Sequence, residues 1–382
     1  MDFDLGENVA ALRQRLRDLI HQETPAGYRG PFTDAAAIAF TERFCRILAD
    51  ARLLTIDWPQ EFGGAGAGLW EQIALREEMW AHDEPRGAQY MGLSWVGPTI
   101  MRFGTDEQRA EHLPRIAAGA VTWSQGFSEP EAGSDLGALK LRARPDGDGG
   151  WHLDGQKIWT SYADLAQWCF LAARTGSDNG RRRDITIFLV PLDRPGITVR
   201  PIPSIMGDHH LNEVFFDDVP VVPSDVLGEV GGGWEVISAV LSFERVGIPR
   251  YARSDRLLAR VADSLPLADE DVDGLRAAHA RLLVRCRMAR LLAYRALADH
   301  ERGEVPLSRP ALARIASTTL DQEVSELIFE ILGPDAITTL REQPLGGRAE
   351  DVWRYARAST VAAGTTEIQR HIIARELTSV VR

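Results

Sequence analysis

Three segments of the chain combine small polar residues with glycine in a way that could hold a ligand. They are residues 125–135 (QGFSEPEAGSD), 154–161 (DGQKIWTS) and 363–370 (AGTTEIQR), and the second follows the first by about twenty residues. Their hydroxyls, backbone amides and tryptophan could offer a bound ligand directed hydrogen bonds and a flat apolar surface.

In this order and at this spacing, the blocks resemble the flavin-contacting blocks of the acyl-CoA dehydrogenase family. The resemblance covers about residues 50–380, including Gly97-Pro98-Thr99 and residues 103–108 (FGTDEQ). It implies FAD as the cofactor and an oxidoreductase that acts on a CH–CH bond. Such an enzyme would convert an acyl thioester, on CoA or an acyl carrier protein, into the trans-2-enoyl thioester.

The resemblance also implies roles for single residues. Phe127 and Ser128 match the positions that offer backbone amides and a small hydroxyl to the flavin pyrimidine edge. Trp159 matches the tryptophan beside the dimethylbenzene side, Ser161 the hydroxyl near N5, and Ser134 the serine near the pyrophosphate or substrate. The other cofactor-binding positions that it implies are Gln125, Thr365 and Glu367.

Two of these residues have structural alternatives. Trp159 stands in an alternating pattern and could be a core residue of a strand. Ser134 and Asp135 could cap a helix, because their side chains accept hydrogen bonds from free amides at a helix start.

The catalytic base is a separate question, because the family's best-known members carry a glutamate directly before Gly-Thr. This chain has Ala363-Gly364 there. Some branches of the family place the base on the first long helix of the C-terminal domain, where this chain has Phe243-Glu244-Arg245.

We therefore expect Glu244 to take the α-proton, since a carboxylate in an apolar pocket has a raised pKa. Arg245, Ala363 and Gly364 are expected to contact the substrate, the Ala363 amide by donating to the thioester carbonyl. The alternative is that Glu244 and Arg245 form a partly exposed ion pair of little energetic consequence.

The chain departs from the family pattern where homotetrameric members grip the FAD of a neighbouring subunit. It lacks an Arg-Gln-x-Phe-Gly block, and an acidic segment, 267–274 (LADEDVDG), stands in that region. The family's adenine loop appears as residues 330–334 (EILGP). These departures resemble bacterial members that work as two-subunit heteromers on steroid or other bulky acyl-CoA chains.

The expected partners are therefore an acyl thioester, an electron-transferring flavoprotein and other dehydrogenase chains. The protein could be a homo-oligomer such as a tetramer, or a heteromer with a second acyl-CoA dehydrogenase chain. Two other functions stay open: a non-catalytic partner subunit, and a flavin monooxygenase or oxidase on the same scaffold.

The periodicity predicts a multi-domain α+β fold, which the resemblance identifies with the acyl-CoA dehydrogenase fold. Residues 1–120 read as an N-terminal helical domain, with Leu5, Val9, Leu12, Leu16 and Leu19 on one helix face. Residues 121–228 read as a β-barrel-like or sandwich domain, with strand patterns and a turn at 146–150 (DGDGG). Residues 229–382 read as a C-terminal four-helix bundle; the glycines at 231–233 are read as a flexible helix entry.

Composition narrows the function classes. The net charge of −12 and the lack of a basic tract argue against a nucleic-acid partner. No apolar run reaches membrane-spanning length, and the acidic N-terminus has no secretory signal pattern. Three isolated cysteines, Cys45, Cys169 and Cys286, favour a reducing cytoplasm and no metal site, with the last two expected to be buried thiols.

Overall fold

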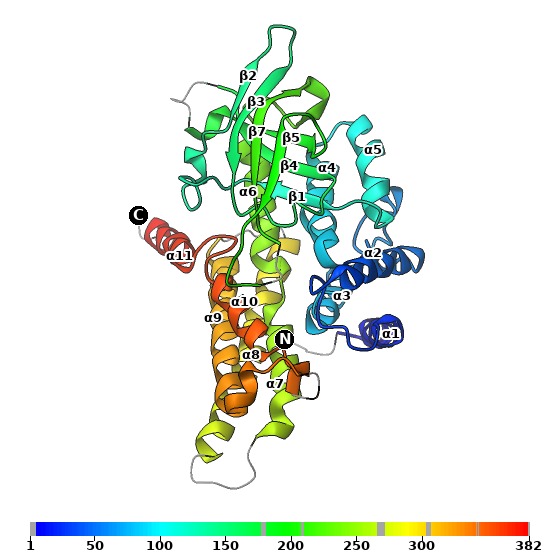
Figure 1. The fold of residues 1–382 in the computed structure, drawn as a ribbon, viewed down its shortest axis with the longest axis vertical. Coiled ribbons are helices and arrows are strands. Elements are labelled where there is room, and N and C mark those ends of the chain that lie inside the picture. Colours follow the sequence, from blue (N-terminus) through cyan, green and yellow to red (C-terminus); the bar gives the residue numbers. More distant parts are fainter. Residues whose placement is uncertain are drawn as a thin grey trace.

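The computed structural model describes residues 5–176, 181–207, 210–265, 272–302, 307–340, 342 and 344–380. Figure 1 shows the β sheet at one end of the long axis, the N-terminal helices beside it, and the long C-terminal helices at the other end. The expected order of helical domain, β domain and helical domain is confirmed. The β domain is one eight-stranded sheet in the described part of the chain.

The N-terminal helices begin where the sequence supplies capping side chains. Asp34 accepts a hydrogen bond from the Ala37 amide at 2.7 Å, and Thr105 and Gln108 form a reciprocal capping box. Val9 and Leu16 are buried as the spacing predicts. The helices are α1 (Glu7–Glu23), α2 (Ala35–Asp50), α3 (Leu69–Ala81), α4 (Gly97–Phe103) and α5 (Asp106–Ala117), with a π-helical turn, η3 (Gly92–Val96), before α4.

The sheet has the strand order β6-β7-β3-β2-β4-β5-β8, and β1 pairs in parallel with β4 off this path. The predicted turn at residues 146–150 joins β2 and β3 as an antiparallel hairpin. The strands are β1 (Trp123–Gly126), β2 (Arg142–Pro145), β3 (Trp151–Lys157), β4 (Trp168–Arg174), β5 (Ile185–Pro191), β6 (Ile197–Pro201), β7 (Asn212–Val221) and β8 (Val226–Leu227).

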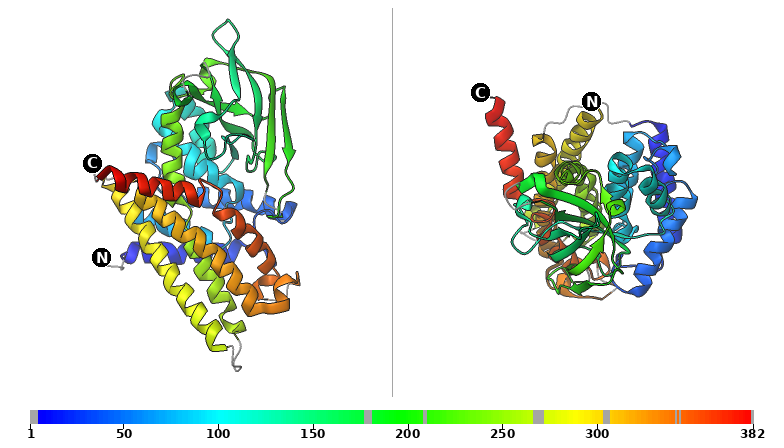
Figure 2. Two further views of the ribbon diagram at one scale, coloured as in Figure 1. Left: turned by 90° about the vertical axis from the view of Figure 1, so that its left-hand side faces the viewer. Right: turned by 90° about the horizontal axis from the view of Figure 1, so that it is seen from above.

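The C-terminal helices pack through a small-residue face of the long α8, where Cys286, Ala289 and Ala293 are buried. Figure 2 shows α8 and α9 running side by side, with α11 crossing near the sheet. The helices are α6 (Gly233–Gly247), α7 (Arg250–Val261), α8 (Val272–Glu301), α9 (Ser308–Leu332), α10 (Ala349–Ser359) and α11 (Thr366–Val380).

The entry into α6 is closely packed rather than merely flexible. A Cβ at Gly233 would lie 2.7 Å from the Ile185 carbonyl oxygen of β5, so only glycine fits there. This close approach fixes the start of α6 against the sheet. The acidic segment that stands in place of the family's FAD-gripping block lies mostly outside the described residues, which resume at Val272.

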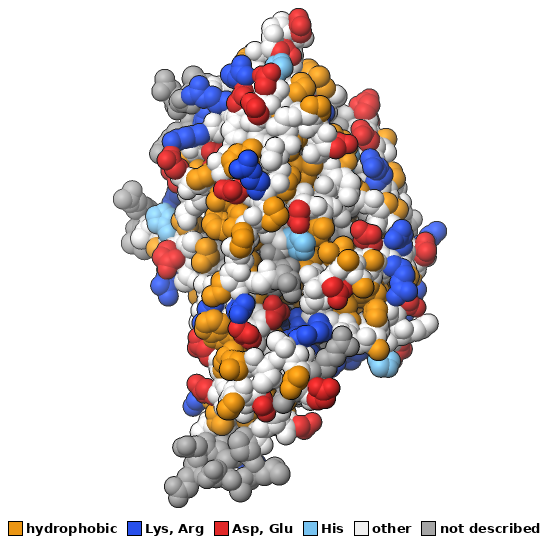
Figure 3. Space-filling model, in the orientation of Figure 1, with side chains coloured by type: hydrophobic (Ala, Val, Ile, Leu, Met, Phe, Trp, Pro, Cys, Tyr) orange, Lys and Arg blue, Asp and Glu red, His pale blue; other side chains and the backbone are white. Residues whose placement is uncertain are grey.

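One apolar core joins the N-terminal helices, the sheet and α6, since Val96, Phe127, Phe170 and Val240 belong to the same buried cluster. All three cysteines are free and buried. Acidic and basic side chains are interspersed over the face seen in Figure 3. Over the described residues, no helix is long and apolar enough to cross a membrane, and no cluster of three or more His, Cys, Asp or Glu side chains could bind a metal ion.

Candidate flavin and substrate site

The first predicted flavin block begins on β1. Parallel pairing places Gln125 opposite Phe170 and Gly126 opposite Leu171 of β4. Gly126 is needed there, because a Cβ would lie 2.9 Å from Cys169 Sγ and 3.0 Å from Leu171 Cδ1. β1 therefore ends at a fixed point of the sheet and delivers the loop that contains Phe127 and Ser128.

A buried ion pair holds this loop. Lys157, at the end of β3, is fully buried; its Nζ donates to Glu129 Oε1 at 2.6 Å and to the Phe127 carbonyl at 3.1 Å. Glu129 also accepts hydrogen bonds from the Lys140 amide at 2.5 Å and the Leu141 amide at 2.9 Å. Burial lowers the pKa of Lys157, and the Glu129 carboxylate opposes that shift. This pair therefore ties the first block to the second.

The backbone joins the same two blocks directly. The Ile158 amide donates to the Ser128 carbonyl at 2.9 Å, and the Thr160 amide donates to the Asn212 carbonyl of β7 at 2.9 Å. Trp159, between these two bonds, has φ +58° and leaves 55% of its surface exposed. The alternative of a core tryptophan is therefore wrong. Held in strained backbone and open to solvent, its indole offers a flat apolar surface.

Two buried polar atoms in the first two blocks lack a protein partner, which fits a flavin ring. Gln125 Oε1 and Thr160 Oγ1 are buried and have no hydrogen-bond partner. An unpaired buried acceptor is costly, so it favours a ligand that brings an N–H donor, as a flavin pyrimidine does. Ser161 is half-buried directly after these groups, whereas Ser134 is exposed in a loop before the one-turn helix η4 (Leu136–Ala138). Asp135 is the N-cap of η4 and its side chain makes no capping hydrogen bond, so the predicted cap is not formed by that residue.

The third block forms a tight turn before α11. Ala363 and Gly364 both have left-handed backbone, at φ +56° and +92°, and Gln369 Nε2 donates to the Gly364 carbonyl at 3.2 Å. Thr365 Oγ1 accepts from the Ile368 amide at 3.3 Å and so caps α11.

Glu367 is exposed in the first turn of α11, where hydrogen bonds from its own backbone amide and from Thr365 lower its pKa. Thr365 and Glu367 thus lie at the start of α11, which packs on α9. The contacts of β1 and β3, by contrast, join the segments that contain Phe127, Ser128 and Trp159.

Glu244 and Arg245 lie in the last turn of α6, and their side chains are outside the described part of the structure. The helix itself is well placed, because it packs against η3, β5 and α9 and shares the core of Phe127. The predicted base, Glu244, is therefore carried by a helix that contacts both the sheet domain and the C-terminal helices.

Sequence reasoning missed the Lys157–Glu129 pair and a group of buried arginines at the start of α7. A signal for the pair was present, because Lys157 is one of only two lysines and falls at an inward position of β3. The arginine group, Arg250 and Arg253, had no such signal in an arginine-rich chain.

Comparison with family models gives three consecutive matches. They are the acyl-CoA dehydrogenase N-terminal domain at residues 7–120, the middle domain at residues 124–219 and the C-terminal domain at residues 231–378. Together these models span almost the whole chain.

Individual proteins give matches of the same extent. The acyl-CoA dehydrogenase IpdE1 of Mycobacterium tuberculosis is 35% identical, over 98% of this chain and 97% of its own length. Among solved structures, the Tcur3481–Tcur3483 steroid ACAD has a TM-score of 0.88 and 28% identity over 99% of both chains. The ChsE4–ChsE5 complex of Mycobacterium tuberculosis also has a TM-score of 0.88, with 27% identity over 100% of both chains.

Proposed function

Because this chain belongs to the acyl-CoA dehydrogenase family, we propose that it catalyses the α,β-dehydrogenation of an acyl thioester. FAD is the family's characteristic cofactor, and when bound it accepts the hydride that leaves the β-carbon. The residues proposed to hold it are Gln125, Phe127, Ser128, Trp159 and Ser161, with contributions from Ser134, Thr365 and Glu367.

One observation carries the proposal: the first two blocks are joined by a buried ion pair and by backbone hydrogen bonds around an exposed, strained tryptophan. The Lys157–Glu129 contact and the Ile158–Ser128 bond hold the loop that would offer hydrogen bonds to the flavin. Such preorganisation is needed because the hydrogen bonds to a flavin set its electronic properties. A purely structural role would not require a half-exposed indole at positive φ.

The reaction also requires a base that removes the α-proton and a donor that binds the thioester carbonyl. Ala363 has no carboxylate to take the α-proton, so the base must come from another element. Glu244 on α6 is our candidate, since a carboxylate in an apolar, water-poor pocket is basic enough near neutral pH. The amide of Ala363 would donate to the thioester carbonyl and stabilise the developing enolate, while Arg245 and Gly364 help to position the substrate.

The partners are proposed from the relatives. Two similar structures are named as a steroid ACAD of two components and as a two-protein complex. We propose that this chain likewise assembles with a second dehydrogenase chain, acts on a bulky acyl thioester, and passes electrons to an electron-transferring flavoprotein.

The first experiment is the visible absorption spectrum of the purified chain, followed by anaerobic titration with a panel of acyl thioesters. We expect bound flavin to bleach without oxygen when the right thioester is added. The variant Glu244→Gln should retain flavin and lose at least about a hundredfold in its reduction rate, because a general base contributes roughly 10²–10⁴-fold. Glu235→Gln, an exposed glutamate in the first turn of the same helix, is the matched control and should bleach normally.

A Glu244→Gln protein that bleaches at the wild-type rate would remove Glu244 from the mechanism. The absence of a carboxylate at Ala363 also supports a second function, a non-catalytic partner subunit. Two results would support that function. The isolated chain would bind no FAD, and its addition would not increase flavin reduction in a complex whose second chain holds the flavin. Flavin that bleaches without oxygen and regains its colour rapidly when oxygen is admitted would favour an oxidase. Flavin that no thioester reduces, on a protein that still oxygenates its substrate, would favour a monooxygenase.

A further inference from the structure

Two buried arginines stand at the start of α7 with hydrogen-bonding capacity left over. Arg250 and Arg253 are only 5% and 6% exposed. Arg250 Nη1 donates to Asp321 of α9 at 3.1 Å, but its Nε has no acceptor. Arg253 Nε lies 3.8 Å from an Asp83 carboxylate oxygen, and its Nη1 has no acceptor. A guanidinium donor that is buried without an acceptor is costly, so the site favours an added oxygen.

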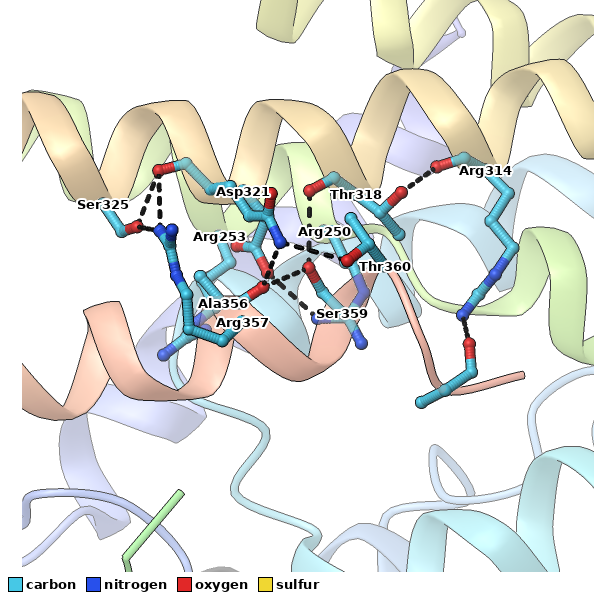
Figure 4. A network of polar contacts seen from close by, with 12 residues as sticks. Arg250, Arg253, Arg314, Thr318, Asp321, Ser325, Ala356, Arg357, Ser359 and Thr360 are labelled. Carbon is cyan, nitrogen blue, oxygen red and sulfur yellow. Dashed lines mark hydrogen bonds and ion pairs between the residues drawn. The ribbon is translucent and has the colours of Figure 1, made fainter. Parts of the chain in front are cut away.

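Aromatic rings hold these guanidinium groups in place. Tyr355 of α10 lies under both, with its ring centre 5.3 Å from Arg250 Cζ and 4.8 Å from Arg253 Cζ. Trp80 of α3 lies 5.8 Å from Arg250 Cζ. The close view in Figure 4 shows Arg250 and Arg253 beside Asp321, between α9 and α10. The donors are therefore fixed by three separate elements rather than free to turn toward water.

A small cavity adjoins Arg250. Its volume is about 10 Å³, and its lining includes Ile248, Arg250, Arg314, Ser317 and Thr318. That is about the space required by one water molecule or one carbonyl oxygen. The lining is polar on the α9 side and contains an arginine with an unused donor, so the chemistry that it suits is a hydrogen-bond acceptor.

The cavity touches two parts of the proposed reaction site. Ile248 directly follows α6, the helix that carries Glu244. Arg314, which also lines the cavity, donates to the Ala362 carbonyl, next to Ala363. Figure 4 shows this side chain reaching from α9 to the loop after α10. An acyl chain bound between α6 and this loop would thus pass beside the unused donor of Arg250.

We propose that Arg250 donates a hydrogen bond to an oxygen on the acyl group of the substrate, so that the enzyme selects acyl thioesters bearing a keto or carboxylate oxygen. This inference rests on the proposed function and specifies its substrate class. The selection has a physical reason. A site that binds an oxygen discriminates against the analogue that lacks it, because the buried donor then has no hydrogen-bond partner. The competing explanation is that Arg250 serves only to neutralise the buried Asp321.

The test compares hexanoyl-CoA, 5-oxohexanoyl-CoA and adipoyl-CoA on the flavin-loaded protein, in complex with its second chain if one is required. We expect kcat/KM for one oxygen-bearing thioester to exceed that for hexanoyl-CoA by at least about tenfold, the usual effect of a charge-assisted hydrogen bond. A preference for 5-oxohexanoyl-CoA identifies a keto group as the ligand, and a preference for adipoyl-CoA identifies a carboxylate.

The variant must not leave Asp321 as an unpaired buried charge. The double variant Arg250→Met/Asp321→Asn removes the donor and the charge of its partner together, and should reduce the preference to less than about threefold. Arg194→Met/Asp225→Asn makes the same change at an ion pair of 2.8 Å in the sheet domain and should keep the preference. Melting temperatures of both proteins show whether each is folded.

A second variant, Arg250→Lys, keeps a positive charge for Asp321 but removes Nε, and should also lose the preference. The inference is overturned if the wild type shows no preference while bleaching normally, or if the folded double variant keeps the preference. Failure of the proposed function looks different, because then no thioester bleaches the flavin of the wild type.

Discussion

At the residue scale, the central feature is that a lysine and a glutamate 28 positions apart form a fully buried pair beneath the predicted flavin loop. The pair costs desolvation, which the contact at 2.6 Å and the added amide bonds to Glu129 offset. Its role in this structure is positional, because the Lys157 ammonium also holds the Phe127 carbonyl.

The two lysines of the chain provide a matched test of this role. Lys157→Met leaves Glu129 buried without its partner, so we expect unfolding free energy to fall by about 3–5 kcal/mol and FAD retention to fall with it. Lys140→Met breaks an exposed contact with Glu131 and should change stability by less than about 1 kcal/mol. Urea denaturation and the flavin absorbance of the purified proteins measure both effects. Equal losses in the two variants would refute the positional role.

At the element scale, arginines of α1 fasten that helix to acidic residues of α3. Arg13 contacts both Glu77 and Glu78, and Arg17 donates to both oxygens of Glu78 at 2.8 and 2.9 Å. Tyr294 of α8 also donates to Glu77 at 2.9 Å, which extends the same polar cluster to the C-terminal helices. α1 is thus docked by buried charge as well as by Val9 and Leu16.

This docking should weaken in acid. Burial raises the pKa of Glu78, but hydrogen bonds from Arg17 and Arg13 outweigh burial and set its pKa below the ordinary value. A carboxyl group with a depressed folded-state pKa stabilises the fold above its unfolded pKa, and this stabilisation disappears as pH falls through the folded pKa.

We therefore expect Glu78→Gln to cost about 1–3 kcal/mol at pH 7 and progressively less below about pH 4.5. Glu42→Gln, at an exposed position of α2, is the control and should be near neutral at each pH. Urea unfolding followed by circular dichroism at several pH values measures both. A Glu78→Gln penalty that stays constant into acid would contradict this account.

At the scale of the whole molecule, the C-terminal helices carry apolar side chains that the chain itself does not cover. On α8, Val284 and Met288 are 58% and 56% exposed and stand one helical turn apart on the same face. α8 forms an outer surface of the molecule in Figure 2. Paired exposed apolar residues on a long outer helix are typical of a surface that another chain covers.

Assembly should therefore depend on this face. We expect Met288→Arg to lower the molar mass of the native particle, because a charge would be buried in the contact. Val222→Arg, at an exposed apolar position beyond β7, should leave the mass unchanged. Light scattering coupled to size-exclusion chromatography distinguishes the two, and an unchanged mass for Met288→Arg would exclude the face as an interface.

Local spacing in the sequence was enough to predict several features. The period of three and four residues predicted α1, and the strand patterns and the turn at residues 146–150 predicted the β domain and its β2–β3 hairpin. The polar blocks at residues 125–135 and 154–161 also identified the family, because they are contiguous motifs whose spacing can be read directly.

Which side chains meet depends on the fold. Lys157 at the end of β3 contacts Glu129 in the loop after β1, and Arg250 contacts Asp321, which is 71 positions away in the chain. Neither pairing has a local pattern, since charged residues are common and their partners are chosen by the packing of distant elements. Trp159 shows the same limit: its alternating pattern suited a core residue, yet the loop geometry exposes its ring. Whether a charged or aromatic side chain is buried depends on the packing of distant elements, and burial sets the energetic cost of leaving a charge unpaired.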